Sequence, residues 1–154
     1  MHEGPAPSAW VRRFVPLVPG GAPALDLACG SGRNTRLLLE SGHPVTAIDI
    51  DVSNVADLAG RSFGGVVVTN YLHRPLLEGL VAAVAPGGVL IYETFCEGNE
   101  ALGNRVTNPD FLLRHGELLE LARGRLRVVA YEDVVVAEPK PAAIQRICAV
   151  RPAG

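Results

Sequence analysis

The sequence lacks a basic run and has no apolar stretch long enough to cross a bilayer. Its formal net charge is −2, from 14 Lys and Arg against 16 Asp and Glu, and this balance argues against a general nucleic-acid-binding protein. Its apolar segments end well before the roughly 20 residues that a membrane helix needs. We therefore expect no nucleic-acid partner and no membrane partner.

Cysteine is also scarce. Cys29, Cys96 and Cys148 lie far apart and show no metal-ligand spacing. They predict free thiols in a reducing compartment and no metal site. The first residues carry Glu3 and several prolines in place of the basic and apolar regions of a signal peptide, so we expect a cytoplasmic protein.

There is no internal repeat and no sign of a second domain. The 154 residues fit one domain over 1–154, with 1–7 as a loose tail. The 17 Gly and 12 Pro fall between periodic segments, which is typical of an α/β fold with tight turns.

The rest of the chain is organised around the segment ALDLACGSGRN at 24–34. Its apolar start predicts a buried strand over 24–28, followed by a glycine loop and a helix over 31–40. A dinucleotide fingerprint would place a third glycine where this chain has Thr35. Asp26, four residues before Gly30, suits a cationic ligand better than a pyrophosphate.

A second strand is predicted over 45–48, where the sequence is β-branched and apolar. Asp49 follows this strand, 19 residues after Gly30. An acidic side chain at this position can accept hydrogen bonds from the hydroxyls of a ribose. This role is common to folds that bind NAD and folds that bind S-adenosylmethionine (SAM), so it does not separate the two.

The loop segment resembles motif I of the class I SAM-dependent methyltransferases, with Ala28 in place of the first glycine of that motif. Gly30 to Asn34 is similar to small-molecule and tellurite-resistance-type methyltransferases, and Ala85-Pro86-Gly87-Gly88 is similar to the family's turn before strand five. The resemblance implies an α/β, Rossmann-like sheet that is mostly parallel. The segments 125–136 and 143–150 would form its antiparallel C-terminal hairpin.

The interval after the second strand is shorter than in that family. Only 14 residues, 51–64, separate it from the next apolar run at 65–70, which is enough for a single crossover. We therefore predict that the edge strand three is missing and that the sheet order is 2-1-4-5-7-6. The strand at 45–48 would then be an unprotected edge, which invites a homodimer.

The resemblance also implies SAM as cofactor. Asp26 and the loop backbone would hold the methionine part of SAM. Asp57 would reach the adenine, unless Asp57 is simply a solvated helix carboxylate. The implied cofactor-binding residues are Asp26, Ala28, Cys29, Gly30, Gly32, Asn34, Asp49, Ile50, Asp57 and Asn70.

Candidate catalytic residues follow two further strands. Tyr71 and His73 come after the strand at 65–70, beside the switch point where open α/β sheets bind ligands. Glu93 follows the strand at 89–92. His73 or Glu93 would serve as a base and Tyr71 would shape the pocket, unless His73 instead caps the helix predicted over 75–85.

These residues favour an enzyme that transfers a methyl group in line from SAM to an unidentified small-molecule acceptor. One alternative is a degenerate fold that binds SAM or a related nucleoside without turnover. It is favoured by the short middle and by Gly64, where the family often has an acid. An NAD-type oxidoreductase is disfavoured by Thr35 and by the closing hairpin.

Overall fold

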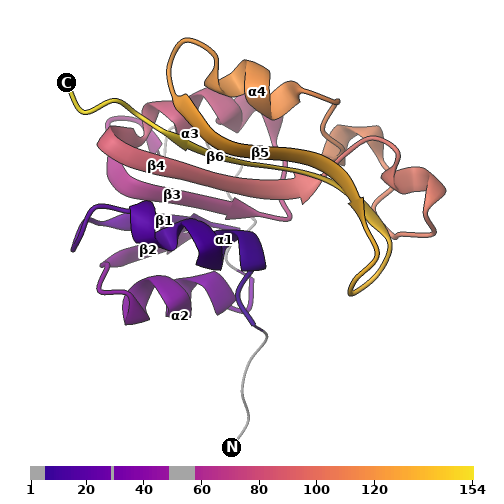
Figure 1. Ribbon diagram of the computed structural model, residues 1–154, viewed down its shortest axis with the longest axis horizontal. Coiled ribbons are helices and arrows are strands. Elements are labelled where there is room, and N and C mark those ends of the chain that lie inside the picture. The colour runs from indigo at the N-terminus through magenta and orange to yellow at the C-terminus, as the bar shows by residue number, and fades with distance from the viewer. Residues whose placement is uncertain (1–5, 29, 49–57) are drawn as a thin grey trace, which may run out of the picture.

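The computed structural model describes residues 6–28, 30–48 and 58–154 (Figure 1). The helices are α1 (Ala9–Phe14), α2 (Arg33–Glu40), α3 (Leu77–Ala82) and α4 (Glu117–Ala122), with short 3₁₀ turns η1 (Val15–Leu17), η3 (Arg74–Leu76), η4 (Asn99–Ala101) and η5 (Pro109–Phe111). The strands are β1 (Ala24–Leu27), β2 (Val45–Ile48), β3 (Phe63–Thr69), β4 (Val84–Phe95), β5 (Arg127–Val136) and β6 (Ala142–Val150). Both strands predicted around the glycine loop are therefore present.

The strands that the structure describes form one sheet in the order β2-β1-β3-β4-β6-β5. β2, β1, β3 and β4 are parallel, and β6 pairs antiparallel with both β4 and β5. If the number three is kept for the strand that the sequence analysis expects to be missing, the order of the described strands corresponds to the predicted 2-1-4-5-7-6. The pairing of the β2 edge with a second copy stays a prediction.

Each face of the sheet has its own apolar cluster, because side chains alternate along a strand. Leu25, Val68 and Leu90 pack with α3 and α4 on one face. Val67 and Ile91 pack with α1 and α2 on the other face. Burial on both faces explains why the parallel strands read as continuous apolar runs. No helix in the described ranges combines the length and apolar character of a membrane span.

The carboxyl ends of β1, β3 and β4 meet at one edge of the sheet. The register pairs Leu27 with Val68 and Thr69 with Glu93, so the segments that leave these strands start side by side. In an open α/β sheet, ligands bind at this edge. The fold therefore places the glycine loop next to the segment that starts at Asn70.

The turn predicted at 85–88 is instead a bulge within β4. Phe63 pairs with Val84, and Gly65 pairs with Val89. Residues 85–88 of β4 therefore lie opposite the single residue Gly64 of β3. Gly87 has a φ of 78°, and its N–H donates to the carbonyl of Arg151 at 2.9 Å. Pro and Gly still set the local bend, but the chain is already paired at Val84. The helix predicted over 75–85 is correspondingly shorter, because it is η3 followed by α3.

The segment after β4 is less regular than the elements before it. It holds η4 and η5, and the helical stretch predicted from Pro109 is divided into η5 and α4. Cys96 forms an isolated parallel bridge with Leu113, which draws this segment back to the end of β4. The crossover predicted between β2 and β3 lies largely in 49–57, outside the described residues.

Candidate functional site

Asp26 is a fully buried carboxylate in the middle of a parallel strand. Its Oδ2 accepts a hydrogen bond from the Thr35 hydroxyl at 2.6 Å. Its Oδ1 is buried and has no hydrogen-bond partner among the described residues. Burial raises the pKa of the Asp26 carboxyl, and the Thr35 hydrogen bonds and the charge of Arg33 offset part of that rise. Such an oxygen is costly unless a ligand supplies its partner.

The loop beside Asp26 has the backbone that its glycines predict. Gly30 and Gly32 have φ of 52° and 81°, and no neighbouring atom lies within 4 Å of where a Cβ on Gly30 would stand. Ala28 also has a positive φ, 58°, and its N–H donates to the carbonyl of Ile48 at 2.6 Å. The loop therefore leaves open space above Gly30, where a ligand can approach the backbone closely.

Asn34 is buried in the first turn of α2 and ties three segments together. Its Oδ1 accepts from the backbone N–H of Ser8 at 3.1 Å, and its Nδ2 donates to the hydroxyl of Thr69 at 3.1 Å. Its side-chain Oδ1 and amide nitrogen are thus held inside the protein. Asn34 thereby joins the residue before α1, the first turn of α2 and the end of β3; its predicted contact with a cofactor stays a prediction.

Asn70, Tyr71 and His73 follow the end of β3, as the sequence predicts. Asn70 has a φ of 55°, which asparagine tolerates better than most residues, and its N–H donates to the carbonyl of Glu93 at 2.9 Å. The carbonyl of Tyr71 accepts from the buried hydroxyl of Tyr92 at 2.7 Å. Burial raises the pKa of the Tyr71 phenol, so at neutral pH it is a proton donor in hydrogen bonds. His73 precedes η3 without a side-chain capping bond.

Glu93 is half-buried and already engaged. Its Oε2 accepts from Arg146 at 3.3 Å, and its Oε1 accepts from the hydroxyl of Ser8 at 3.4 Å. Arg146 also pairs with Glu132 at 2.5 Å. Arg146 and Ser8 therefore occupy both oxygens of this carboxylate.

Four of the predicted cofactor-binding residues cannot be placed in the site. Cys29, Asp49, Ile50 and Asp57 lie outside the described residues. The site as described therefore consists of Asp26, the loop backbone and the segment after β3.

Packing explains why residue 64 is glycine, where the resembled family often has an acidic residue. A Cβ added there would collide with the Cβ of Ala22 and approach the Cδ of Pro19 at 3.5 Å. The segment that leads into β1 lies directly over this strand, so a side chain at 64 is excluded.

One cluster was not anticipated from the sequence. Cys96, His115 and Asp133 each offer a ligand atom, and these atoms lie within 4.8 Å of one another. Their separations in sequence follow no metal motif, so only strand register and the loop before α4 reveal them.

Comparison with known proteins places the fold. No protein-family model and no curated protein matches the chain, whereas solved structures do. TehB from Haemophilus influenzae matches with a TM-score of 0.71 and 14% identity, over 92% of this chain and 61% of that chain. The chain thus spans less than two thirds of the length of TehB.

Two further structures are matched over more of their length. A TehB-like SAM-dependent methyltransferase from Corynebacterium glutamicum has a TM-score of 0.63 and 17% identity, over 94% of this chain and 89% of that one. The 1,6-didemethyltoxoflavin-N1-methyltransferase of Burkholderia thailandensis, with bound S-adenosylhomocysteine, has a TM-score of 0.65 and 19% identity, over 94% and 79%. The chain therefore has the fold of the class I SAM-dependent methyltransferases.

Proposed function

We propose that this chain is a SAM-dependent methyltransferase that acts on a small-molecule acceptor. The observation that carries the proposal is the buried Oδ1 of Asp26, which has no partner among residues 6–28, 30–48 and 58–154, and beside which those residues leave open space above Gly30. A ligand that is cationic where it faces Asp26 would satisfy this oxygen and remove the cost of the buried charge. The bound S-adenosylhomocysteine of the toxoflavin enzyme supports a sulfur nucleoside as that ligand.

In this proposal the described residues have distinct tasks. Asp26 and the backbone of Ala28, Gly30 and Gly32 hold the methionine part of the cofactor. Asn34 keeps the first turn of α2 against Thr69, so that the loop is fixed before the cofactor arrives. Asp49, Ile50 and Asp57, outside the described residues, are proposed for its nucleoside.

The acceptor site is proposed at the segment after β3. When bound, the cofactor supplies a methyl group on a good leaving group, so the protein has mainly to orient the acceptor. Tyr71 donates a hydrogen bond from its phenol, and His73 accepts a proton from the acceptor at a ring nitrogen. Glu93 holds Arg146 at the rim of the site.

The direct test is calorimetric titration with SAM and with S-adenosylhomocysteine, followed by methyl transfer to a panel of amines and other small nucleophiles. Asp26→Asn should lower SAM affinity about 10- to 100-fold, because a hydrogen bond to a charged group contributes about 1.5–3 kcal/mol. Asp110→Asn, which neutralises an exposed carboxylate on η5, is the matched control and should bind like the wild type. No heat from the wild type at millimolar SAM would refute the proposal.

The loop offers a second matched pair. Gly30 and Gly103 both have positive φ, 52° and 72°, and both have no atom within 4 Å of an added Cβ. Alanine should cost each a similar backbone strain, but only Gly30→Ala should lose SAM affinity. Equal binding by the two variants would show that the loop does not touch the cofactor.

The role of His73 needs a separate measurement. His73→Ala should lower turnover while SAM affinity stays unchanged. Binding of SAM without turnover on any acceptor would favour a degenerate fold over an enzyme.

A further inference from the structure

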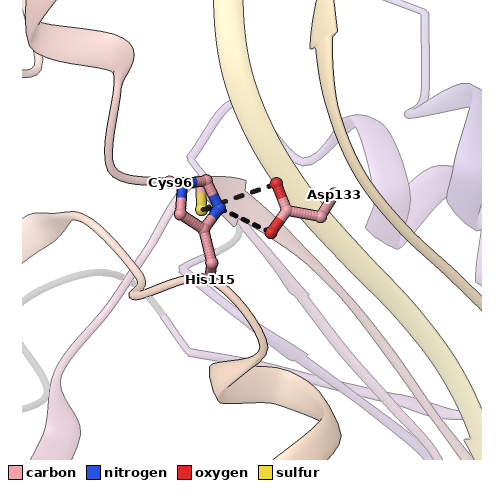
Figure 2. A group of neighbouring side chains, drawn as sticks. All are labelled: Cys96, His115 and Asp133. Atoms are coloured by element: carbon pink, nitrogen blue, oxygen red, sulfur yellow. Dashed lines mark hydrogen bonds and ion pairs between the residues drawn. The ribbon is translucent and has the colours of Figure 1, made fainter.

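The strongest cluster outside the proposed cofactor site joins three elements that are distant in the chain. Cys96 follows β4, His115 precedes α4, and Asp133 lies in β5 (Figure 2). The Sγ of Cys96 lies 3.6 Å from Nδ1 of His115 and 4.0 Å from Oδ1 of Asp133. The same Nδ1 lies 2.7 Å from Oδ2 of Asp133. One thiol, one imidazole nitrogen and one carboxylate therefore converge on a single point.

This arrangement differs from that of a cysteine nucleophile. In a nucleophile–histidine–acid relay, the nucleophile meets one ring nitrogen and the acid meets the other. Here Cys96 and Asp133 both approach Nδ1 of His115, and one nitrogen cannot serve both partners in that way. A shared point of approach is what a bound cation requires.

The distances suit a tetrahedral zinc ion. Zinc bonds of about 2.3 Å to sulfur and about 2.0–2.2 Å to nitrogen and oxygen separate neighbouring ligands by roughly 3.3–3.6 Å. The 3.6 Å between Cys96 Sγ and His115 Nδ1 already matches, and the 2.7 Å between His115 and Asp133 would open by roughly half an ångström. A thiolate and a carboxylate would also balance the charge of Zn²⁺.

The surroundings of the three side chains support ligation. Gln145 is fully buried, and its Nε2 donates to Cys96 Sγ at 3.4 Å and to the carbonyl of Arg114 at 2.9 Å. The Oε2 of Glu97 accepts the backbone N–H of His115 at 3.0 Å, and its Oε1 lies 3.9 Å from Nε2. A carboxylate near the second ring nitrogen is a common neighbour of a metal-bound histidine, although 3.9 Å is too long for a hydrogen bond in this structure.

We propose that Cys96, His115 and Asp133 form a Zn²⁺ site with three protein ligands and a fourth position open to solvent. Cys96 is buried, whereas the side chains of His115 and Asp133 are 61% and 26% exposed, so an ion can enter from the surface. A soft thiolate with an imidazole selects zinc over magnesium or calcium. The site would tie the segment after β4 to α4 and to β5. It does not depend on the proposed methyl transfer.

The test uses the full-length, metal-free protein and zinc alone. Titration monitored by calorimetry should give one equivalent of Zn²⁺, and Cys96→Ala, His115→Ala and Asp133→Asn should each weaken binding at least tenfold. Cys148→Ala is the matched control, because Cys148 is equally buried but packs on the opposite face of the sheet. It should bind zinc like the wild type.

Cobalt substitution supplies a readout that protein stability cannot imitate. Co²⁺ bound to a thiolate gives a sulfur-to-metal charge-transfer absorption, expected in the wild type and in Cys148→Ala but absent in Cys96→Ala. Circular dichroism shows whether each variant is folded. Failure of the wild type to take up an equivalent of Zn²⁺ would overturn the proposal. Wild-type affinity in a folded Cys96→Ala would overturn it as well, because the ion would then be held elsewhere.

Discussion

The two halves of the sheet are built differently. Around β1 and β3, the carboxyl edge has a buried carboxylate oxygen that no described residue bonds, and Ala28, Gly30 and Gly32 have positive φ. Around β4, β6 and β5, charged side chains pair between strands, as Arg146 does with Glu93 at 3.3 Å and with Glu132 at 2.5 Å. The first half leaves an open loop and a buried oxygen for a ligand, whereas the second half uses its charged side chains in ion pairs and in the proposed zinc site.

The largest change of stability is expected where the first half is packed most tightly. Gly64→Ala places a methyl group against Ala22, and overpacking of this kind costs about 1–3 kcal/mol. Urea unfolding of Gly64→Ala should show this loss. Adding Ala22→Gly should restore part of it, whereas Gly20→Ala, with open space around it, should be close to neutral.

The ion pair that joins the segment after β3 to α4 should also contribute to stability. Arg74 donates to both carboxylate oxygens of Glu117, at 2.8 and 2.9 Å, and to the carbonyl of Leu112 at 2.8 Å. Arg74→Met should cost about 1–2 kcal/mol, a value reduced because Arg74 is partly exposed. Arg123→Met, which breaks the exposed pair with Glu120, should cost under about 0.5 kcal/mol. Equal losses would erase the contrast between the buried and the exposed pair.

The phenol of Tyr92 adds a side-chain hydrogen bond to the strand pairing between the halves. Tyr92→Phe removes the 2.7 Å hydrogen bond to the carbonyl of Tyr71 and should cost about 1 kcal/mol. Because this bond holds the segment after β3, we also expect the variant to lower turnover. Tyr131→Phe, on the hairpin, is the control and should leave turnover unchanged.

The smallest expected difference between the two halves is in how the free energy of unfolding depends on pH. Burial raises the folded-state pKa of Asp26 above its ordinary value of 3.8, so the folded state holds the proton more tightly than the unfolded chain. This group therefore favours folding at low pH, and its contribution is lost as pH rises through the raised pKa. The unfolding free energy of the cofactor-free wild type, relative to Asp26→Asn, should fall over that interval.

Glu117 should show the opposite sign. Burial alone would raise its pKa, but the hydrogen bonds from Arg74 and the backbone of Arg114 leave it lowered from 4.5. Its contribution is present above the unfolded value and is lost as pH falls through the folded one. Comparing the wild type with Glu117→Gln over the acidic range isolates it. The same sign for both carboxyls would contradict the difference drawn between the two halves.

Most of the fold could be predicted because its signals are local. The apolar runs at β1 and β2, the glycines between β1 and α2, and the shortened interval before β3 each lie within one stretch of chain. The interval was decisive, since its length excludes a further strand and helix. The bulge at 85–88 was not predicted, because Pro and Gly serve a reversal and a bulge equally well.

The two proposed sites differ in the same way, because only the first has a local signal in the sequence. Asp26 could be singled out from its place before the glycine loop, whereas its unpartnered oxygen is visible only after packing. The grouping of Cys96 with Asp133 depends on the sheet register, in which Gln145 pairs with both Thr94 and Asp133. No spacing within the sequence encodes that register.

The buried Oδ1 of Asp26 has a consequence for how fast the protein is degraded. An occupant that neutralises it stabilises the native state in proportion to its abundance. Proteases act on transiently opened chains, so a shortage of the occupant would shorten the lifetime of the polypeptide. The supply of a metabolite would then set how much of this protein survives.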